Sequence, residues 1–358
     1  MRMNNQTLRC LFMIFFVVQL PRVPAQEETD PYTVQDSIFI MNDFFDHDQP
    51  AEITLIFNVK KYQQNKYINK YIPAELIYYM GDSLIEKHNN LKIKARGTSR
   101  KEVCLFPPIR LKVSGKGIPT NLPPELKFVK IVTHCKGSKT NLNYMMKEFL
   151  TYKIYNIISP YSFHVRLLKM KYIDTGRKNK VTETWAFMLE PEAMLAGRMD
   201  MIPVKLDHLG FLYTDIIWAS YMTMFQYMIG NTDFSLAGRH NIKLLKSNDP
   251  LSVSLIPVPY DFDYSGIVNA SYAVPREELG LKSITERYFL GPCRSIDDYL
   301  AVINMLQAKK EEIYNLINSF EYLPESERKT VIKYLDGFYN NSYDSRYIEK
   351  YILSTCQN

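Results

Sequence analysis

The chain has 358 residues, of which 46% are hydrophobic and 23% are charged, and its formal net charge is +6. This length predicts one large or two ordinary globular domains. A net charge this small does not favour a nucleic-acid-binding protein.

The first 25 residues have the features of a secretory signal peptide. They contain three arginines, no acidic residue, and an apolar run, Leu11–Leu20, that is too short to span a bilayer. Ala25 offers a small residue at the cleavage point. We therefore expect an exported protein, in the periplasm or at the cell surface, with a net charge of +3 and no transmembrane segment after cleavage.

Four cysteines follow the predicted signal peptide, and three disulfide pairings among them are formally possible. A chain this long does not need disulfides for its core, so buried free thiols are the alternative. The four are Cys104, Cys135, Cys293 and Cys356.

Residues 26–50 lack a periodic pattern and predict an irregular lead-in. Alternating and β-branched runs then predict six strands, and one helix capped by Asn141 and ending before Pro160 interrupts them. Residues 51–190 are thus predicted to form a β-rich lobe. The predicted strands are Ala51–Val59, Leu91–Ala95, Ile109–Val113, Lys127–Thr133, Val165–Ile173 and Glu183–Leu189.

Helices dominate the predicted second lobe, residues 191–358. Leu212–Ile229 is apolar almost all round, as expected of a buried helix. Two strand-like runs, Asn241–Leu245 and Ser252–Ile256, predict a hairpin. Further helices are predicted at Ile296–Phe320, Ser326–Tyr339 and Tyr343–Leu353.

Three polar residues, Asp233, Asn241 and Asp261, surround this hairpin in the order in which kinases place a hydroxyl-orienting aspartate and two metal ligands. The motif order resembles the spore-coat protein H (CotH) kinase-like family, in its Bacteroidetes-type exported version, and more distantly HipA-type kinases. The resemblance spans about Ile53 to Asp336. Its strongest blocks are Arg96–Ser99, Cys104–Lys112, Leu126–Cys135, Gly230–Asp233, His240–Asn241 and Pro259–Asp263.

The resemblance implies an α+β, two-lobed protein-kinase-like fold and transfer of a phosphoryl group from ATP with Mg²⁺ or Mn²⁺. Asp233 would orient or deprotonate a hydroxyl on a protein or glycan of the cell envelope. Asn241 and Asp261 would bind the metal, because hard cations prefer oxygen ligands. Asp263 would join them or stabilise the loop.

The first lobe would bind the nucleotide. A turn containing Arg96, Gly97 and Ser99 would approach phosphate oxygens, and a cation from the next strands would contact the phosphates and pair with Glu148. Glu190 would lie near the adenine. His134 and His240 receive no catalytic role, because a lone histidine is more often structural. The candidate cations are Arg110, Lys112 and Lys130.

Two departures leave other functions open. Asp233 and Asn241 are separated by seven residues, more than in the protein-kinase catalytic loop, and no glycine follows Asp261-Phe262. One alternative is a catalytically silent binding module of the cell envelope, which export favours because ATP is scarce in that compartment. The other is a metal-dependent phosphohydrolase that uses the same carboxylates.

Overall fold

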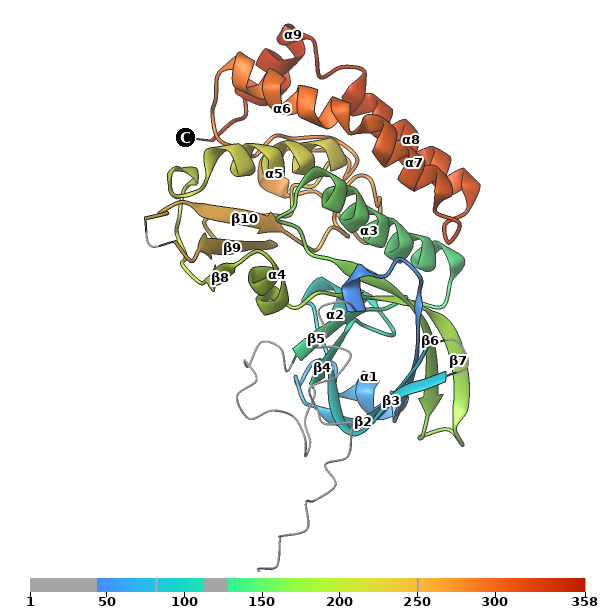
Figure 1. The fold of residues 1–358 in the computed structure, drawn as a ribbon. Helices are drawn as coiled ribbons and strands as arrows, with labels where there is room; N and C mark the ends of the chain where they lie inside the picture. The colour runs from blue at the N-terminus through green and yellow to red at the C-terminus, as the bar shows by residue number, and fades with distance from the viewer. Residues whose placement is uncertain (1–43, 81–82, 113–127, 250, 358) are drawn as a thin grey trace, which may run out of the picture. The chain divides into compact units, whose positions relative to one another are not determined.

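The structure of the protein is a computed structural model that describes residues 44–80, 83–112, 128–249 and 251–357. Seven strands form a closed barrel, and a mainly helical part with a small three-stranded sheet follows it (Figure 1). The predicted α+β class is therefore correct, but the closed barrel was not predicted and does not clearly match the predicted two-lobed kinase-like fold. The predicted signal peptide lies outside the described residues.

The barrel strands run in the order β1-β2-β3-β4-β5-β7-β6, and all neighbours are antiparallel except the closing pair β1 and β6. Burial alternates along β4, where Ile109 and Leu111 are buried and Arg110 and Lys112 are not. The strands are β1 (Ala51–Phe57), β2 (Ile72–Met80), β3 (Ser83–Ala95), β4 (Ile109–Lys112), β5 (Phe128–Val132), β6 (Val165–Asp174) and β7 (Lys180–Leu189).

Three helices connect barrel strands: α1 (Val59–Gln64), α2 (Ser99–Val103) and α3 (Lys139–Ile158). The predicted cap of α3 is wrong, because the Oγ of Ser138 accepts the backbone N–H of Asn141. The second part begins with α4 (Glu192–Arg198), β8 (Met201–Val204) and α5 (Ile216–Ile229). Asp215 caps α5 by accepting two backbone N–H groups, so this helix starts later than predicted.

The small sheet has the order β10-β9-β8, with β9 at Ile242–Ser247 and β10 at Leu255–Pro259. The C-terminal helices are α6 (Ile296–Ala308), α7 (Lys310–Ser319), α8 (Glu325–Tyr339) and α9 (Ser345–Ile348), followed by a π-helical segment, Glu349–Leu353. Short 3₁₀ helices occupy Phe44–Asp46, Phe211–Tyr213 and Glu277–Leu279. None of the helices that the structure describes combines the length and apolarity needed to cross a bilayer.

Two disulfides pair all four cysteines that follow the predicted signal peptide, Cys104 with Cys135 and Cys293 with Cys356. One hydrophobic cluster fills the barrel. A larger one joins α3, β6 and β7 of the first part to α5 and the C-terminal helices. The face of α3 thus connects the two parts through shared apolar packing.

Candidate functional site

The loop after α5 is fixed by Gly230 and Asn231. Gly230 ends α5 with φ of +64°, and a Cβ there would lie 2.0 Å from the hydroxyl oxygen of Tyr334. Asn231 is buried, and its Nδ2 donates to Oε1 of Gln226 at 3.0 Å. Its Oδ1 accepts the backbone N–H of Asp233 at 3.0 Å. Asp233 therefore follows a rigid helix end.

The Asp233 carboxylate has two side-chain partners. Nε2 of His240 lies 2.9 Å from Oδ1, and Nδ2 of Asn241 donates to Oδ2 at 3.0 Å and to the Asp233 carbonyl at 2.7 Å. The hydrogen bond to Asp233 raises the pKa of His240 above its ordinary value. The Asp233 side chain remains 30% exposed, so an oriented carboxylate faces solvent.

The β9–β10 hairpin places Asp261 at the same end as Asn241. Ile242 is paired with Pro259, and the backbone N–H of Tyr260 donates to the carbonyl of Asn241 at 3.0 Å. Both Asn241 and Asp261 have left-handed backbones, which asparagine and aspartate adopt more readily than most residues. The structure thus brings Asp233, Asn241 and Asp261 to one end of the hairpin.

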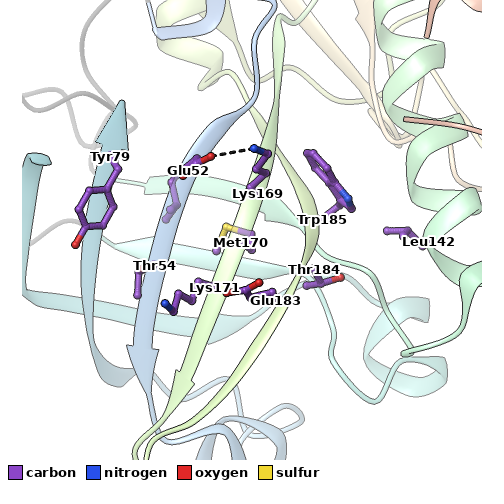
Figure 2. Close-up of a pocket in the computed structure, with 11 residues that line it drawn as sticks. Glu52, Thr54, Tyr79, Leu142, Lys169, Met170, Lys171, Glu183, Thr184 and Trp185 are labelled. Carbon is purple, nitrogen blue, oxygen red and sulfur yellow. Dashed lines mark hydrogen bonds and ion pairs between the residues drawn. The ribbon is translucent and has the colours of Figure 1, made fainter. Parts of the chain in front are cut away.

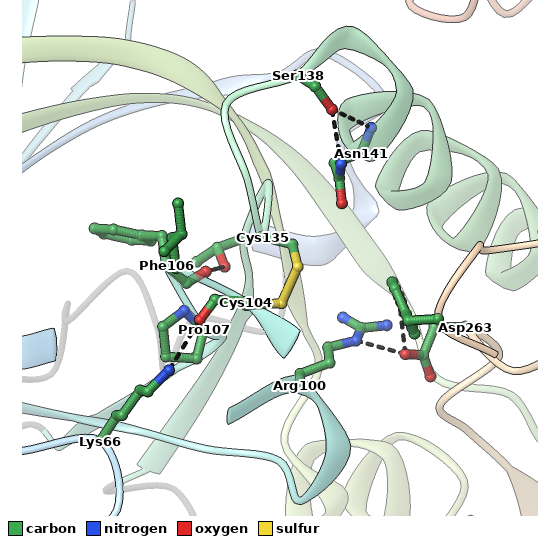
Figure 3. Close-up of a disulfide and its surroundings, with 12 residues drawn as sticks. Lys66, Arg100, Cys104, Phe106, Pro107, Cys135, Ser138, Asn141 and Asp263 are labelled. Atoms are coloured by element: carbon green, nitrogen blue, oxygen red, sulfur yellow. Dashed lines mark hydrogen bonds and ion pairs between the residues drawn. A yellow bond between two sulfur atoms is a disulfide. The ribbon is translucent and has the colours of Figure 1, made fainter. Parts of the chain in front are cut away.

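Asp261 also belongs to a second group of acids, Glu148 on α3, Asp261 and Asp263, which we call the acidic cluster. One oxygen from each lies within 4.8 Å of the others. Nε of Arg100, on α2, donates to Asp263 at 2.7 Å (Figure 3), and its Nη2 donates to Glu148. The guanidinium is 3.9 Å from Asp261. Arg100 therefore links α2, α3 and the segment after β10.

Burial dominates the electrostatics of the acidic cluster. It raises the pKa of Glu148 to about 8 and that of Asp263 to about 6, against the opposing effect of Arg100. Burial also acts on Asp261, but there Arg100 and Arg96 hold the pKa below its ordinary value. The three carboxylates thus depend on nearby positive charge for their ionisation.

The acidic cluster fits a divalent cation. Oε1 of Glu148 is buried without a hydrogen-bond partner, although a buried carboxylate oxygen needs a compensating contact. Asp263 also accepts from the hydroxyl of Tyr272 at 3.1 Å, and the backbone N–H of Asp261 donates to the hydroxyl of Tyr152 at 2.7 Å. These contacts orient the carboxylates as outer partners orient metal ligands.

A turn and a disulfide determine where Arg100 lies. Gly97 has φ of +87°, a conformation that favours glycine, and α2 begins two residues later. Cys104 follows α2, and its disulfide partner Cys135 precedes α3 (Figure 3). The helices that carry Arg100 and Glu148 are thereby linked covalently.

Several other predicted residues surround the acidic cluster. A guanidinium nitrogen of Arg96 lies 3.9 Å from Asp261, and Ser99 is the first residue of α2. The amine of Lys130 sits 4.9 Å from the ring centre of Tyr260. Its pKa is lowered to about 7, mainly by burial and then by Arg96 and Lys243, while Asp261 opposes the shift.

The remaining predicted residues have other partners. Arg110 stacks over Phe128 at 4.4 Å on the outer face of the barrel, and Lys112 lies 5.8 Å from the same ring. The prediction that Arg110, Lys112 or Lys130 pairs with Glu148 is wrong, because Arg100 takes that place. The carboxylate of Glu190 is buried and accepts from Arg198 at 3.0 and 3.2 Å.

Sequence reasoning missed Arg100 and assigned no role to His240. Arg100 stands in Ser-Arg-Lys-Glu, which reads as a solvent-exposed helix, and only its contacts reveal its burial. For His240 a signal was available, because it immediately precedes Asn241 in a block that supported the resemblance. The structure brings its ring to Asp233.

A groove of about 760 Å³ lies on the outer face of the barrel, over β1, β6 and β7 (Figure 2). Glu52, Lys169 and Trp185 contribute to its lining, and Glu52 pairs with Lys169 at 2.9 Å. None of the predicted site residues lines this groove.

Comparison with known proteins gives little further information. No protein-family model matches the chain, and neither does any curated protein. Among solved structures, a crystal structure of the Helicobacter pylori proinflammatory kinase CtkA is similar over 72% of this chain and 95% of that one. The identity is 13% and the TM-score is 0.39, which does not establish a shared fold.

Proposed function

We propose that this protein is an exported phosphotransferase of the CotH-like, kinase-like type, which transfers the γ-phosphoryl group of ATP with Mg²⁺ or Mn²⁺. The observation that supports this best is the acidic cluster, joined to Arg100 and placed beside Asp233 at one end of the hairpin. Metal-binding and hydroxyl-orienting carboxylates in this arrangement are what phosphoryl transfer requires.

Asp261 and Asp263 would hold the divalent ion, with Glu148 as a third carboxylate. Asn241, predicted from the sequence as a metal ligand, donates its amide N–H to Asp233. The ion supplies positive charge that neutralises phosphate oxygens. Arg96 and Lys130 would contact the phosphates from the barrel side. A phosphate beside Lys130 would favour its charged form and so reverse the effect of burial on its pKa.

Asp233 would take the proton from the hydroxyl of the phosphate acceptor. His240 and Asn241 would hold the Asp233 carboxylate in its orientation. The acceptor oxygen forms a bond to the γ-phosphorus, and the bond from that phosphorus to the bridging oxygen of ADP breaks. The acceptor would be a protein or a glycan of the cell envelope. Two disulfides support an exported location, because such bonds persist in oxidising compartments.

A thermal-shift titration with ATP, with and without Mg²⁺ or Mn²⁺, tests nucleotide binding. A ligand at 100 times its Kd adds about 2.7 kcal/mol to the free energy of unfolding. We expect a metal-dependent shift in the wild type that Asp261→Asn abolishes. The control Asp207→Asn changes an exposed aspartate that pairs with Arg239. No shift with ATP and metal in the wild type contradicts the proposal.

Phosphate transfer to a cell-envelope extract tests the role of Asp233. We expect Asp233→Asn to bind ATP normally but to lower transfer by roughly 10²–10⁴-fold, as for loss of a general base. A silent binding module is the second candidate, because Arg100 already compensates two of the three carboxylates. Nucleotide binding without transfer favours that module. Metal-dependent hydrolysis of p-nitrophenyl phosphate without nucleotide affinity favours a phosphohydrolase.

A further inference from the structure

Five cations face outward across three adjacent barrel strands, and we call them the basic ladder. In the register of β3, β4 and β5, Lys92 stands opposite Lys112, Lys94 opposite Arg110, and Arg110 opposite Lys130. Ile93 and Leu111, between the cations of β3 and β4, are buried, and so are the two neighbours of Lys130 in β5, so the five side chains share the outer face. Like charges directly opposite each other in a sheet are destabilising.

No carboxylate within the described part of the chain forms an ion pair with any member of the basic ladder. Aromatic rings accompany the cations instead, with Arg110 over Phe128 at 4.4 Å and Lys94 over Tyr71 at 4.8 Å. Burial and then the neighbouring Arg110 lower the pKa of Lys94. A bound anion would relieve this mutual repulsion.

The basic ladder begins at the candidate site. The amine of Lys130 lies 4.9 Å from the ring centre of Tyr260, the residue that precedes Asp261. From there the cations continue across β4 to Lys92 and Lys94 on β3, away from the acidic cluster. A ligand on the ladder would therefore extend from the site across the barrel.

We propose that the basic ladder binds an acidic polypeptide segment, and that this segment belongs to the phosphate acceptor. The second statement rests on the proposed function. In a sheet, neighbouring strands lie about 4.8 Å apart, and alternate residues of one strand lie about 6.7 Å apart. An extended chain presents alternate side chains at the latter spacing, so its carboxylates match the ladder. The basic ladder crosses only three adjacent strands, which is narrow for a nucleic-acid duplex, and the rings of Tyr71 and Phe128 suit the aliphatic parts of a peptide.

Binding is measured by fluorescence anisotropy, without nucleotide, using a labelled peptide of one serine flanked by three glutamates on each side. A matched peptide carries glutamine in place of every glutamate. We expect the glutamate peptide to bind at least tenfold more tightly at low salt and to lose affinity as salt rises. Equal affinity for the two peptides overturns the proposal.

The double variant Lys92→Glu, Lys94→Glu separates ligand binding from folding. Its new carboxylates face Lys112 and Arg110, so the fold should be as stable as the wild type or more so. We expect at least a tenfold loss of glutamate-peptide affinity with an unchanged or raised melting temperature. The matched control, Lys178→Glu with Lys180→Glu, makes the same charge change at exposed positions around the β6–β7 turn and should keep the affinity.

Unchanged peptide affinity in the ladder variant, or an equal loss in the control, contradicts the proposal. A single-stranded 12-mer of deoxythymidylate that binds more tightly than the glutamate peptide overturns the choice of a polypeptide. Peptide binding at the ladder without any ATP-dependent thermal shift would support the docking surface while contradicting the phosphotransferase function. The two hypotheses therefore fail separately.

Discussion

At one end of the β9–β10 hairpin, two members of the acidic cluster differ in burial from Asp233. Glu148 and Asp263, in the acidic cluster, are almost fully buried and contact one arginine. Asp233 is 30% exposed and contacts a histidine and an asparagine. Enclosure makes Glu148 and Asp263 dependent on positive charge, whereas exposure leaves Asp233 open to a solvent-borne partner. The third member of the acidic cluster, Asp261, is as exposed as Asp233. The same chemical group is thus buried against a cation in one place and accessible to solvent in the other.

The largest expected effect is on the enclosed side. Arg100→Met leaves two buried carboxylates without their cation, which costs about 3–5 kcal/mol of unfolding free energy. Urea denaturation measures this loss. In the control Arg239→Met, the pair with Asp207 is exposed, so a much smaller loss is expected. A loss for Arg100 as small as the control's would show that the acidic cluster does not need its cation.

The two disulfides test whether the acidic cluster depends on its surroundings, because only one of them adjoins it. Replacing both cysteines of either pair by serine should cost roughly 2–4 kcal/mol of stability. Loss of Cys104–Cys135 should also weaken the Mn²⁺-dependent thermal shift, since it frees the helix that carries Arg100. Loss of Cys293–Cys356 should leave that shift intact. Equal Mn²⁺-dependent thermal shifts in the two variants would show that the Cys104–Cys135 disulfide does not affect the acidic cluster.

On the exposed side, Gly230 supports the loop of Asp233. Gly230→Ala adds a Cβ 2.0 Å from the Tyr334 hydroxyl oxygen, whereas Gly280→Ala has the same φ of +64° with nothing within 4 Å. Overpacking should therefore cost Gly230→Ala about 1–3 kcal/mol more than the control. Thermal and urea denaturation give the difference. Equal losses would mean that backbone strain alone requires glycine at Gly230.

The smallest effect concerns His240 in the metal-free protein. Its folded pKa is raised above the ordinary value of 6.5 by Asp233, so its stabilising contribution is complete below pH 6.5 and disappears as pH rises through the folded pKa. The pair is half exposed, which limits the contribution to about 1 kcal/mol or less. Denaturation of wild type and His240→Gln between pH 5 and 9 should converge at the alkaline end. Parallel curves would contradict this.

The sequence predicted residues close in the chain better than residues joined by tertiary contacts. The order of Asp233, Asn241 and Asp261 was visible because all three are close in sequence, before and after one hairpin. Arg100 was missed because its burial depends on α3 and on the segment after β10, both distant in sequence. No local pattern distinguishes it from the neighbouring Lys101.

The fold also depends on contacts that local sequence patterns do not reveal. Strand β2 was not predicted, because Pro73 argues against a regular strand, and β10 was placed too early because it contains Pro257 and Pro259. Proline is tolerated in β10, which lies at the edge of its sheet. Closure of the barrel depends on the parallel pairing of β1 with β6, which their own sequences do not specify.

The apolar face of α3 has a consequence for cooperativity. Phe149 on this helix belongs to the same hydrophobic cluster as Phe187 of β7, Phe225 of α5 and Leu335 of α8. A fragment that stops at Glu190 would expose the apolar face of α3 to water, which promotes aggregation. Melting should therefore be a single transition, and a protease that cuts between the halves should release no resistant barrel.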